Sequence, residues 1–164
     1  MSHIPVNHHL RPLYRFLAGL AGLYVLVFGI VGVTRTGGYG FFAQHGTPSA
    51  VGLHANRAFA ILSIVAGAIV LGAAIIGRNL DRWVNLVGGI VFLVSGFAMM
   101  VLLQTNLNYL GFTMTTCIVS FVIGLVLFTA GLYGKIASKE REAFEERFRL
   151  GGPPALRPAT PHAV

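Results

Sequence analysis

Charged side chains are scarce in this sequence of 164 residues: only 10% are Asp, Glu, Lys or Arg, whereas 55% of the residues are apolar. Soluble domains carry about 25% charged residues. A water-soluble globular fold is therefore excluded, because too much apolar surface would face water. The apolar stretches and their connections use most of the chain, so we expect no second folded domain.

Acidic residues are the rarest of the charged groups, and none lies inside a long apolar stretch. There are five, at Asp81, Glu140, Glu142, Glu145 and Glu146. Proton relays, ion-coupled transport and cation pathways need an ionisable group at membrane depth. The sequence therefore argues against a proton pump and against a channel with its own charged selectivity ring.

Cysteine is nearly absent too. Cys117 stands alone, so the chain forms no internal disulfide and no cysteine-based metal site, and we expect it to be a small packing residue. None of the six histidines falls inside an apolar stretch, which argues against haem ligation at membrane depth. The sequence contains no evident nucleophile–base pair or metal triad, so we expect no enzyme activity, no cofactor and no metal.

Three charge-free apolar stretches are present, and their lengths match a lipid bilayer. Residues 16–34 and 58–77 measure 19 and 20 residues, and residues 83–134 measure 52, interrupted by the polar segment Gln104–Asn108. An α-helix rises ~1.5 Å per residue, so ~20 residues cross the ~30 Å hydrocarbon layer. We predict an all-α polytopic membrane protein, a bundle of four transmembrane helices at about 13–33, 57–77, 82–103 and 111–134.

The connections are short enough to predict which helices are neighbours. We expect Gly77 to end the second span and Asp81 to cap the third, with about four residues between them. These two spans must then be antiparallel neighbours, and the four spans form two antiparallel hairpins. Residues 34–56 contain five glycines and one proline, which predict a loop that lies on the membrane.

Cationic residues are biased to one side of the predicted bundle. Nine flank the spans on the side of both termini, against Arg35 and Arg57 on the other. Under the positive-inside rule, this predicts a multi-pass plasma-membrane protein with both termini in the cytoplasm. The net charge of +7 is thus topogenic and does not indicate a nucleic-acid surface. The nine cations are Arg11, Arg15, Arg78, Arg82, Lys135, Lys139, Arg141, Arg147 and Arg149.

The ends of the chain differ from the spans. Residues 1–12 are predicted to be a cytoplasmic N-terminal tail. Residues 135–150 carry opposite charges four positions apart, which predicts a short charged cytoplasmic helix. Residues 151–164 begin with two glycines and two prolines and are predicted to be a disordered tail.

Small residues recur at the spacing of helix–helix interfaces. In lipid, helices associate by close packing between small residues, because the surrounding acyl chains are as apolar as the side chains. Such seams occur in all four predicted spans, and some of them would be open to a helix of another protein. The predicted packing positions are Gly22, Gly29, Gly67, Gly72, Gly89, Gly96, Ser120, Gly124 and Gly131.

Two polar groups are candidate contact sites on the outer side. His54, Asn56 and Arg57 stand at the start of the second span, where they could meet an anionic headgroup or a carboxylate of a partner. The alternative, which we favour, is a polar helix entrance satisfied by water and backbone. The asparagines and threonines within 106–116 are likewise expected to bond to backbone rather than to a ligand.

A family resemblance is found in four stretches of the sequence, at residues 53–77, 81–86, 104–124 and 129–135. They are similar to a family of small four-span integral membrane proteins of unknown function from mycobacteria and other actinobacteria. The resemblance covers about 13–135 and implies a four-helix bundle in the plasma membrane of a high-GC Gram-positive bacterium. It supplies no catalytic residues.

Two functions stay open on this evidence. The first is a non-catalytic integral membrane protein that acts through helix–helix contacts, as an accessory or scaffolding subunit of a larger membrane complex such as a respiratory assembly. The alternative is a carrier or pore component for a small neutral or lipidic molecule. The expected partners are membrane lipids and other membrane-protein subunits, and nucleic acid is not among them.

Overall fold

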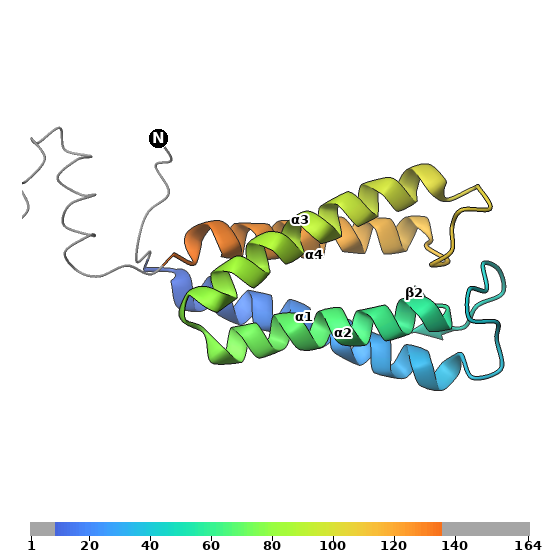
Figure 1. The fold of residues 1–164 in the computed structure, drawn as a ribbon, viewed down its shortest axis with the longest axis horizontal. Coiled ribbons are helices and arrows are strands. Elements are labelled where there is room, and N and C mark those ends of the chain that lie inside the picture. The colour runs from blue at the N-terminus through green and yellow to red at the C-terminus, as the bar shows by residue number, and fades with distance from the viewer. Residues whose placement is uncertain (1–8, 136–164) are drawn as a thin grey trace, which may run out of the picture.

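Four long helices dominate the fold (Figure 1). In the computed structural model, which describes residues 9–135, they are α1 Arg11–Arg35, α2 Arg57–Ile76, α3 Arg78–Leu102 and α4 Met114–Tyr133. Each helix is long and apolar enough to cross a membrane. The prediction of an all-α polytopic four-helix bundle is confirmed, and the helix bounds lie within four residues of the predicted spans.

The predicted tails fall mostly outside the described residues. The charged helix at 135–150 and the disordered tail at 151–164 lie beyond residue 135, apart from Lys135 itself. Of the predicted N-terminal tail at 1–12, only the last four residues are described. Arg11 and Pro12 belong to the first turn of α1, where the fixed backbone angle of proline suits a helix start.

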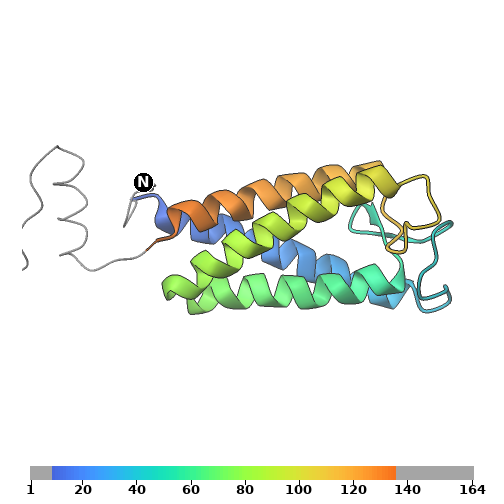
Figure 2. The ribbon, with the colours of Figure 1, turned by 45° about the horizontal axis from the view of Figure 1, so that its top comes forward.

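Helices α1 and α2 form one antiparallel hairpin (Figure 2). They touch along a glycine seam. A Cβ atom added at Gly22 would lie 2.8 Å from the backbone nitrogen of Leu71. A Cβ at Gly67 would overlap the backbone of Leu26. Only glycine allows the two main chains to approach so closely, which is the packing that membrane helices favour.

Helices α3 and α4 form the second hairpin in the same way. A Cβ at Gly89 would lie 2.5 Å from the nitrogen of Phe128, and one at Gly131 would lie 2.5 Å from the nitrogen of Leu86. The remaining predicted packing positions in contact across a hairpin are Gly29 in the first, and Gly96, Ser120 and Gly124 in the second.

Gly72 is the exception among the predicted packing positions. No described atom lies within 4 Å of a Cβ built there, apart from its own chain neighbours and helix backbone. Gly72 is three residues from both Ile69 and Ile75, which are 55% and 71% exposed, so it lies on the outward face of α2. The pairing of Ala68 with Gly72 resembles a seam in sequence, but none of the four described helices covers it.

The connection between the hairpins corrects two predictions. A single residue, Gly77, separates α2 from α3, in place of the four residues expected. Gly77 and Arg78 both have positive φ angles, 71° and 59°, which reverse the chain within one step. The two helices are antiparallel as predicted, but they meet at this turn and then diverge (Figures 1 and 2), so they are neighbours without a close seam.

Asp81 does not cap α3, which is the second correction. The helix begins at Arg78, so Asp81 lies in its first turn, and the cap position is Gly77. The carboxylate of Asp81 is 2% exposed and pairs with Arg11 of α1, with 3.1 Å between Oδ2 and Nη2. A partner 70 residues away in sequence, rather than the local helix end, therefore determines the role of this acid.

Arg11 ties three helices together at the end of the bundle that carries the N-terminus of α1. Its Nε donates to the carbonyl of Gly134 at 3.2 Å, and its Nη2 donates to the carbonyl of Arg78 at 3.1 Å. We call this the cationic end, and the opposite end the loop end. The last carbonyls of a helix have no partner within the helix, so an arginine there satisfies them and complements the helix dipole.

Arg15 does the same for α2. Its Nε donates to the carbonyl of Ala74 at 2.6 Å, and its Nη2 donates to that of Ile75 at 2.8 Å. The guanidinium packs directly on Gly77, where a Cβ would lie 2.6 Å from it. Glycine at 77 is thus required twice, by the positive φ angle and by this contact.

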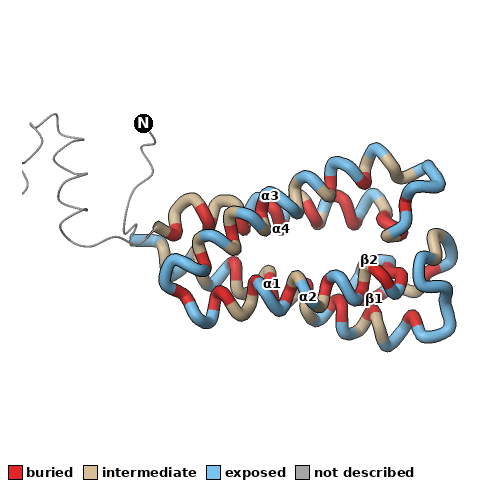
Figure 3. Tube along the Cα trace, viewed as in Figure 1, coloured by how far each residue is buried: buried red, intermediate tan, exposed pale blue. Residues whose placement is uncertain are grey.

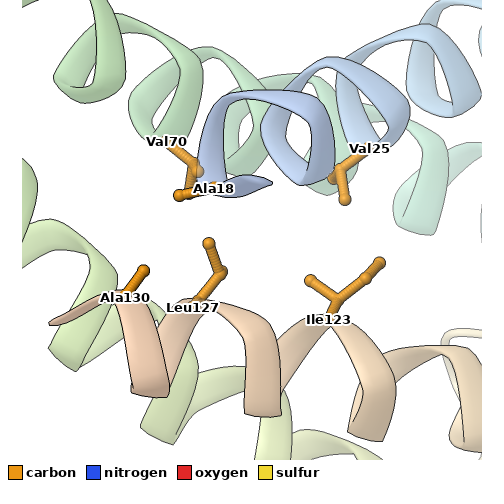
Figure 4. Close-up of a cluster of buried hydrophobic side chains, with 6 residues drawn as sticks. All are labelled: Ala18, Val25, Val70, Ile123, Leu127 and Ala130. Atoms are coloured by element: carbon orange, nitrogen blue, oxygen red, sulfur yellow. The ribbon is translucent and has the colours of Figure 1, made fainter. Parts of the chain in front are cut away.

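Between its two ends, the bundle is held by apolar side chains from three helices. Ala18 and Val25 of α1 and Val70 of α2 face Leu127 of α4, and Ile123 and Ala130 complete this cluster (Figure 4). Large apolar side chains on the outward faces of all four helices are exposed, so that exposed and buried segments alternate along every helix (Figure 3). This pattern suits a bundle whose surroundings are lipid.

A short β-hairpin, which the sequence pattern does not predict, covers the loop end. Strand β1, Ser49–Ala50, pairs antiparallel with β2, Leu53–His54. Val51 and Gly52 between them both have positive φ angles, as a two-residue hairpin turn requires. Ala50 and Leu53 are buried against Phe28 of α1, so the hairpin closes the bundle on this side.

We predict that Gly67→Leu destabilises the protein and that Gly72→Leu does not. The first leucine must displace the backbone of Leu26, at a cost of about 1–3 kcal/mol or more, whereas the second projects into lipid. The measurement is the fraction of protein that stays monodisperse in mild detergent after heating. Equal midpoints for the two variants would contradict the assigned helix contacts.

Candidate functional site

The divergence of α2 and α3 leaves a crevice between them, made of two cavities that share part of their wall. The outer groove, about 390 Å³, lies toward the cationic end and is lined by α2 and α3 alone. The inner chamber, about 130 Å³, lies toward the loop end and is lined by all four helices. Both cavities touch Ala66, Val91 and Phe92, so they meet at mid-depth.

The crevice is as long as one leaflet of a bilayer is deep. Along α3 its lining runs from Trp83 in the outer groove to Ser95 in the inner chamber. These residues are twelve positions apart, which is ~18 Å along a helix axis. Half of a ~30 Å hydrocarbon layer is ~15 Å. The crevice therefore matches the reach of a single acyl chain that enters from the leaflet at the cationic end.

The outer groove is purely apolar. Its other lining residues are aliphatic or glycine, including Ile69 and Val70 of α2 and Val87 and Gly88 of α3. A Cβ at Gly88 would lie 3.7 Å from Leu127 and 3.9 Å from Val70, which is ordinary contact distance. The absence of a side chain at Gly88 thus adds to the free space, rather than allowing a close helix contact.

The inner chamber contains hydroxyl groups, but two of them are already engaged within the protein. Ser63 donates to the carbonyl of Phe59 at 2.8 Å. The hydroxyls of Thr116 and Thr113 are 3.0 Å apart and bond to each other. The aromatic rings of Phe59 and Phe112, with centroids 4.6 Å apart, form part of the wall. The chamber thus offers an apolar surface.

Among the predicted outer contacts, Asn56 is a structural residue. It is 0% exposed, and its amide donates to the carbonyls of Ala43 and Tyr109 at 3.2 and 2.8 Å. Its oxygen accepts from the backbone nitrogen of Phe59 at 2.8 Å, which caps α2. Asn56 therefore joins two loops to a helix start, as the favoured alternative expected, and it cannot meet a ligand from outside.

His54 and Arg57 do not form a site with Asn56. Both are exposed, and Nδ1 of His54 lies 2.8 Å from the carbonyl of Thr47 within the same loop. The predicted outer-face contact of His54, Asn56 and Arg57 is therefore wrong as a single group, because its central member is buried and fully bonded.

Three of the polar residues within 106–116, namely Asn108, Thr113 and Thr116, bond within the protein, as predicted. Asn108 donates to the carbonyl of Phe112 at 3.0 Å and accepts from its nitrogen at 2.9 Å, which closes the turn before α4. Thr113 caps α4 by accepting from the nitrogen of Thr116 at 3.3 Å. Gln44 links the two loops by donating to the carbonyl of Asn106 at 2.9 Å.

Cys117 is buried and reduced in a cluster with Met99 and Phe112, the small packing role expected of it. Within residues 9–135, no three His, Cys, Asp or Glu side chains lie close enough together to hold a metal ion.

Sequence reasoning missed the crevice itself. Its lining is apolar, and apolar side chains that face a cavity have the same pattern as those that face lipid. Two features of the sequence together indicate the crevice. The connection at Gly77 is short, and α2 and α3 have no glycines placed to pack against each other.

The sequence matches no protein-family model and no curated protein, and the fold matches no solved structure. The resemblance to the actinobacterial four-span family therefore stays a prediction, and the function must be argued from the site alone.

We predict that Asn56→Ala destabilises the loop end by about 1–3 kcal/mol, because it removes the cap of α2 and leaves buried carbonyls without partners. Arg57→Ala, at the next position, removes an exposed side chain and is expected to leave stability unchanged. Thermal midpoints of the two variants in detergent check this. A stable Asn56→Ala protein would contradict the structural role of Asn56.

Proposed function

We propose that this chain is a non-catalytic membrane protein that binds a lipidic molecule, with one hydrophobic chain held in the crevice between α2 and α3. The observation that carries the proposal is an apolar crevice of about 390 and 130 Å³ that lies between two membrane helices. The proposal develops the carrier alternative of the sequence analysis, restricted to its binding step.

Free space in the inner chamber is unfavourable, whereas the outer groove is open along α2 and α3 and leads to it. Side chains that line a void lose dispersion contacts on one side, and a close-packed interior normally leaves few such voids. An apolar cavity of ~150 Å³ already holds a molecule the size of benzene. At membrane depth, acyl or isoprenoid chains are the abundant molecules of the right polarity, and water is not.

The matched pair Gly88→Leu and Gly72→Leu tests the proposal. Both replace a glycine within a membrane helix, but only Gly88 lines the crevice. We expect wild type and Gly72→Leu to retain one lipidic molecule per chain through detergent exchange, counted by native mass spectrometry. Retention by Gly88→Leu should fall at least threefold, with the thermal midpoint measured in parallel to show that the variant is folded.

Equal retention by the two variants, or no lipidic molecule retained by folded wild-type protein, would overturn the proposal.

The accessory or scaffolding role is the second candidate, and one observation favours it. Most of the glycine seams that motivated it are used within the chain, but Ala68 is exposed and no described residue covers Gly72. This pair offers a small-residue surface to a helix of another membrane protein. In that role, Gly72→Leu should remove a stoichiometric partner from gentle purifications, whereas Gly88→Leu should keep it.

The proposal includes an orientation, with the cationic end and both termini in the cytoplasm. Among residues 9–135, five cations lie at that end and only Arg35 and Arg57 lie at the loop end, which supports it under the positive-inside rule. A cysteine introduced at Ser49, with Cys117 replaced by serine, should react with a membrane-impermeant thiol reagent on intact cells. Labelling only after cell lysis would reverse the orientation.

A further inference from the structure

The outer groove ends at a polar site on the cationic end of the bundle. Trp83 lines the groove there, and its side chain is 57% exposed. The guanidinium of Arg82 lies over its ring, 5.4 Å from the centroid. Tryptophan rings settle at the headgroup level of a bilayer, so the groove opens where lipid phosphates lie.

Among the described residues, Arg82 is the cation with a buried donor that has no acceptor. Its Nε is buried and has no hydrogen-bond partner, and no described residue accepts a hydrogen bond from its guanidinium. The nearby arginines differ: Arg11 is engaged by Asp81, and Arg15 by the carbonyls at the end of α2. Arg82 as a whole is only half-buried, so an acceptor from outside the chain can approach the exposed part of this guanidinium, whose hydrogen-bonding capacity the described residues leave unused.

Within residues 9–135, no free carboxylate at this end competes with an external anion. The one carboxylate, Asp81, is 2% exposed and already neutralised by Arg11. Arg78 lies one helical turn before Arg82 on α3 and is exposed, so it adds a second positive charge to the same side of the helix. The charge here therefore complements a phosphate.

Selectivity for a lipid must arise at this polar end. A hydrocarbon chain that moves from the bilayer into an apolar crevice gains little, because both surroundings are equally apolar. The headgroup, by contrast, exchanges water for an arginine when the lipid binds, so its contacts can distinguish one lipid from another. Basic pockets between membrane helices are known to recognise anionic headgroups in this way.

We infer that the crevice holds an anionic phospholipid from the leaflet at the cationic end, with its phosphate at Arg82 and Arg78 and one acyl chain running past Trp83 into the inner chamber. The inference rests on the proposed function, and it adds the headgroup class, the leaflet and the direction of the chain.

Trp83 makes a direct test practical, because it is the single tryptophan of the chain and it lines the groove. Phospholipids with brominated chains quench tryptophan on contact. The probes are brominated phosphatidylglycerol and brominated phosphatidylcholine, titrated into the full-length protein in detergent. We expect quenching to saturate at one lipid per chain, with the anionic lipid bound at least fivefold more tightly.

Variants separate the headgroup from the chain. Arg82→Gln should reduce the preference for phosphatidylglycerol roughly fivefold, the typical contribution of one cation near a membrane surface, and Arg82→Lys should restore much of it. Arg57→Gln removes a cation at the loop end and should leave the preference unchanged. Inorganic phosphate at the lipid concentration should not compete.

The failures are distinguishable. Suppose that quenching saturates and that Gly88→Leu abolishes it. If the wild type then shows no headgroup preference, or if Arg82→Gln keeps the same preference, this inference is overturned and the proposed function stands. Competition by inorganic phosphate would show a free-anion site and would also overturn it. Quenching that never saturates, or that is equal in Gly88→Leu and Gly72→Leu, would remove the proposed function as well.

Discussion

The one-residue turn at Gly77 is the constraint on which the rest of the structure depends. Two helices joined by a single residue must leave the turn at an angle, and the left-handed conformations of Gly77 and Arg78 set that angle. The guanidinium of Arg15 packs on Gly77 and holds the end of α2 in place. Because α2 and α3 then diverge, no glycine seam closes between them, and the crevice is the direct result.

Polar interactions hold the bundle at its ends and apolar packing holds it between them. Arg11 and Arg15 satisfy helix carbonyls at the cationic end, and Asn56 does the same for loop carbonyls at the loop end. In lipid, burial of apolar surface gives helices little reason to associate, so close contact at glycines and satisfied end groups must supply the stability. A ligand in the crevice would supply the packing that α2 and α3 lack.

Much of the fold could be predicted from the sequence, because span length and the absence of charge depend on composition alone. The glycine seams also follow from spacing, yet Gly72 shows the limit: Ala68 and Gly72 have the spacing of a seam, and only the fold shows that no described helix lies against them. For Asp81 the sequence predicts a local cap, because its partner Arg11 is 70 residues away. For Asn56 it favours a bonded helix entrance, but it does not show that a partner is the carbonyl of Tyr109, 53 residues away. The lining of the crevice could not be predicted, since cavity-facing and lipid-facing valines have the same pattern.

The most direct measurement of the central claim is photochemical labelling in the membrane. A phospholipid with a photoreactive group in its acyl chain would be incorporated with the protein into bilayers, activated, and its attachment sites mapped by mass spectrometry. The account predicts that adducts concentrate on Ala66 and Phe92, which are partly buried where the two cavities meet. Adducts spread evenly over outward side chains such as Val94, Phe97 and Ile75, without enrichment at the crevice, would contradict it.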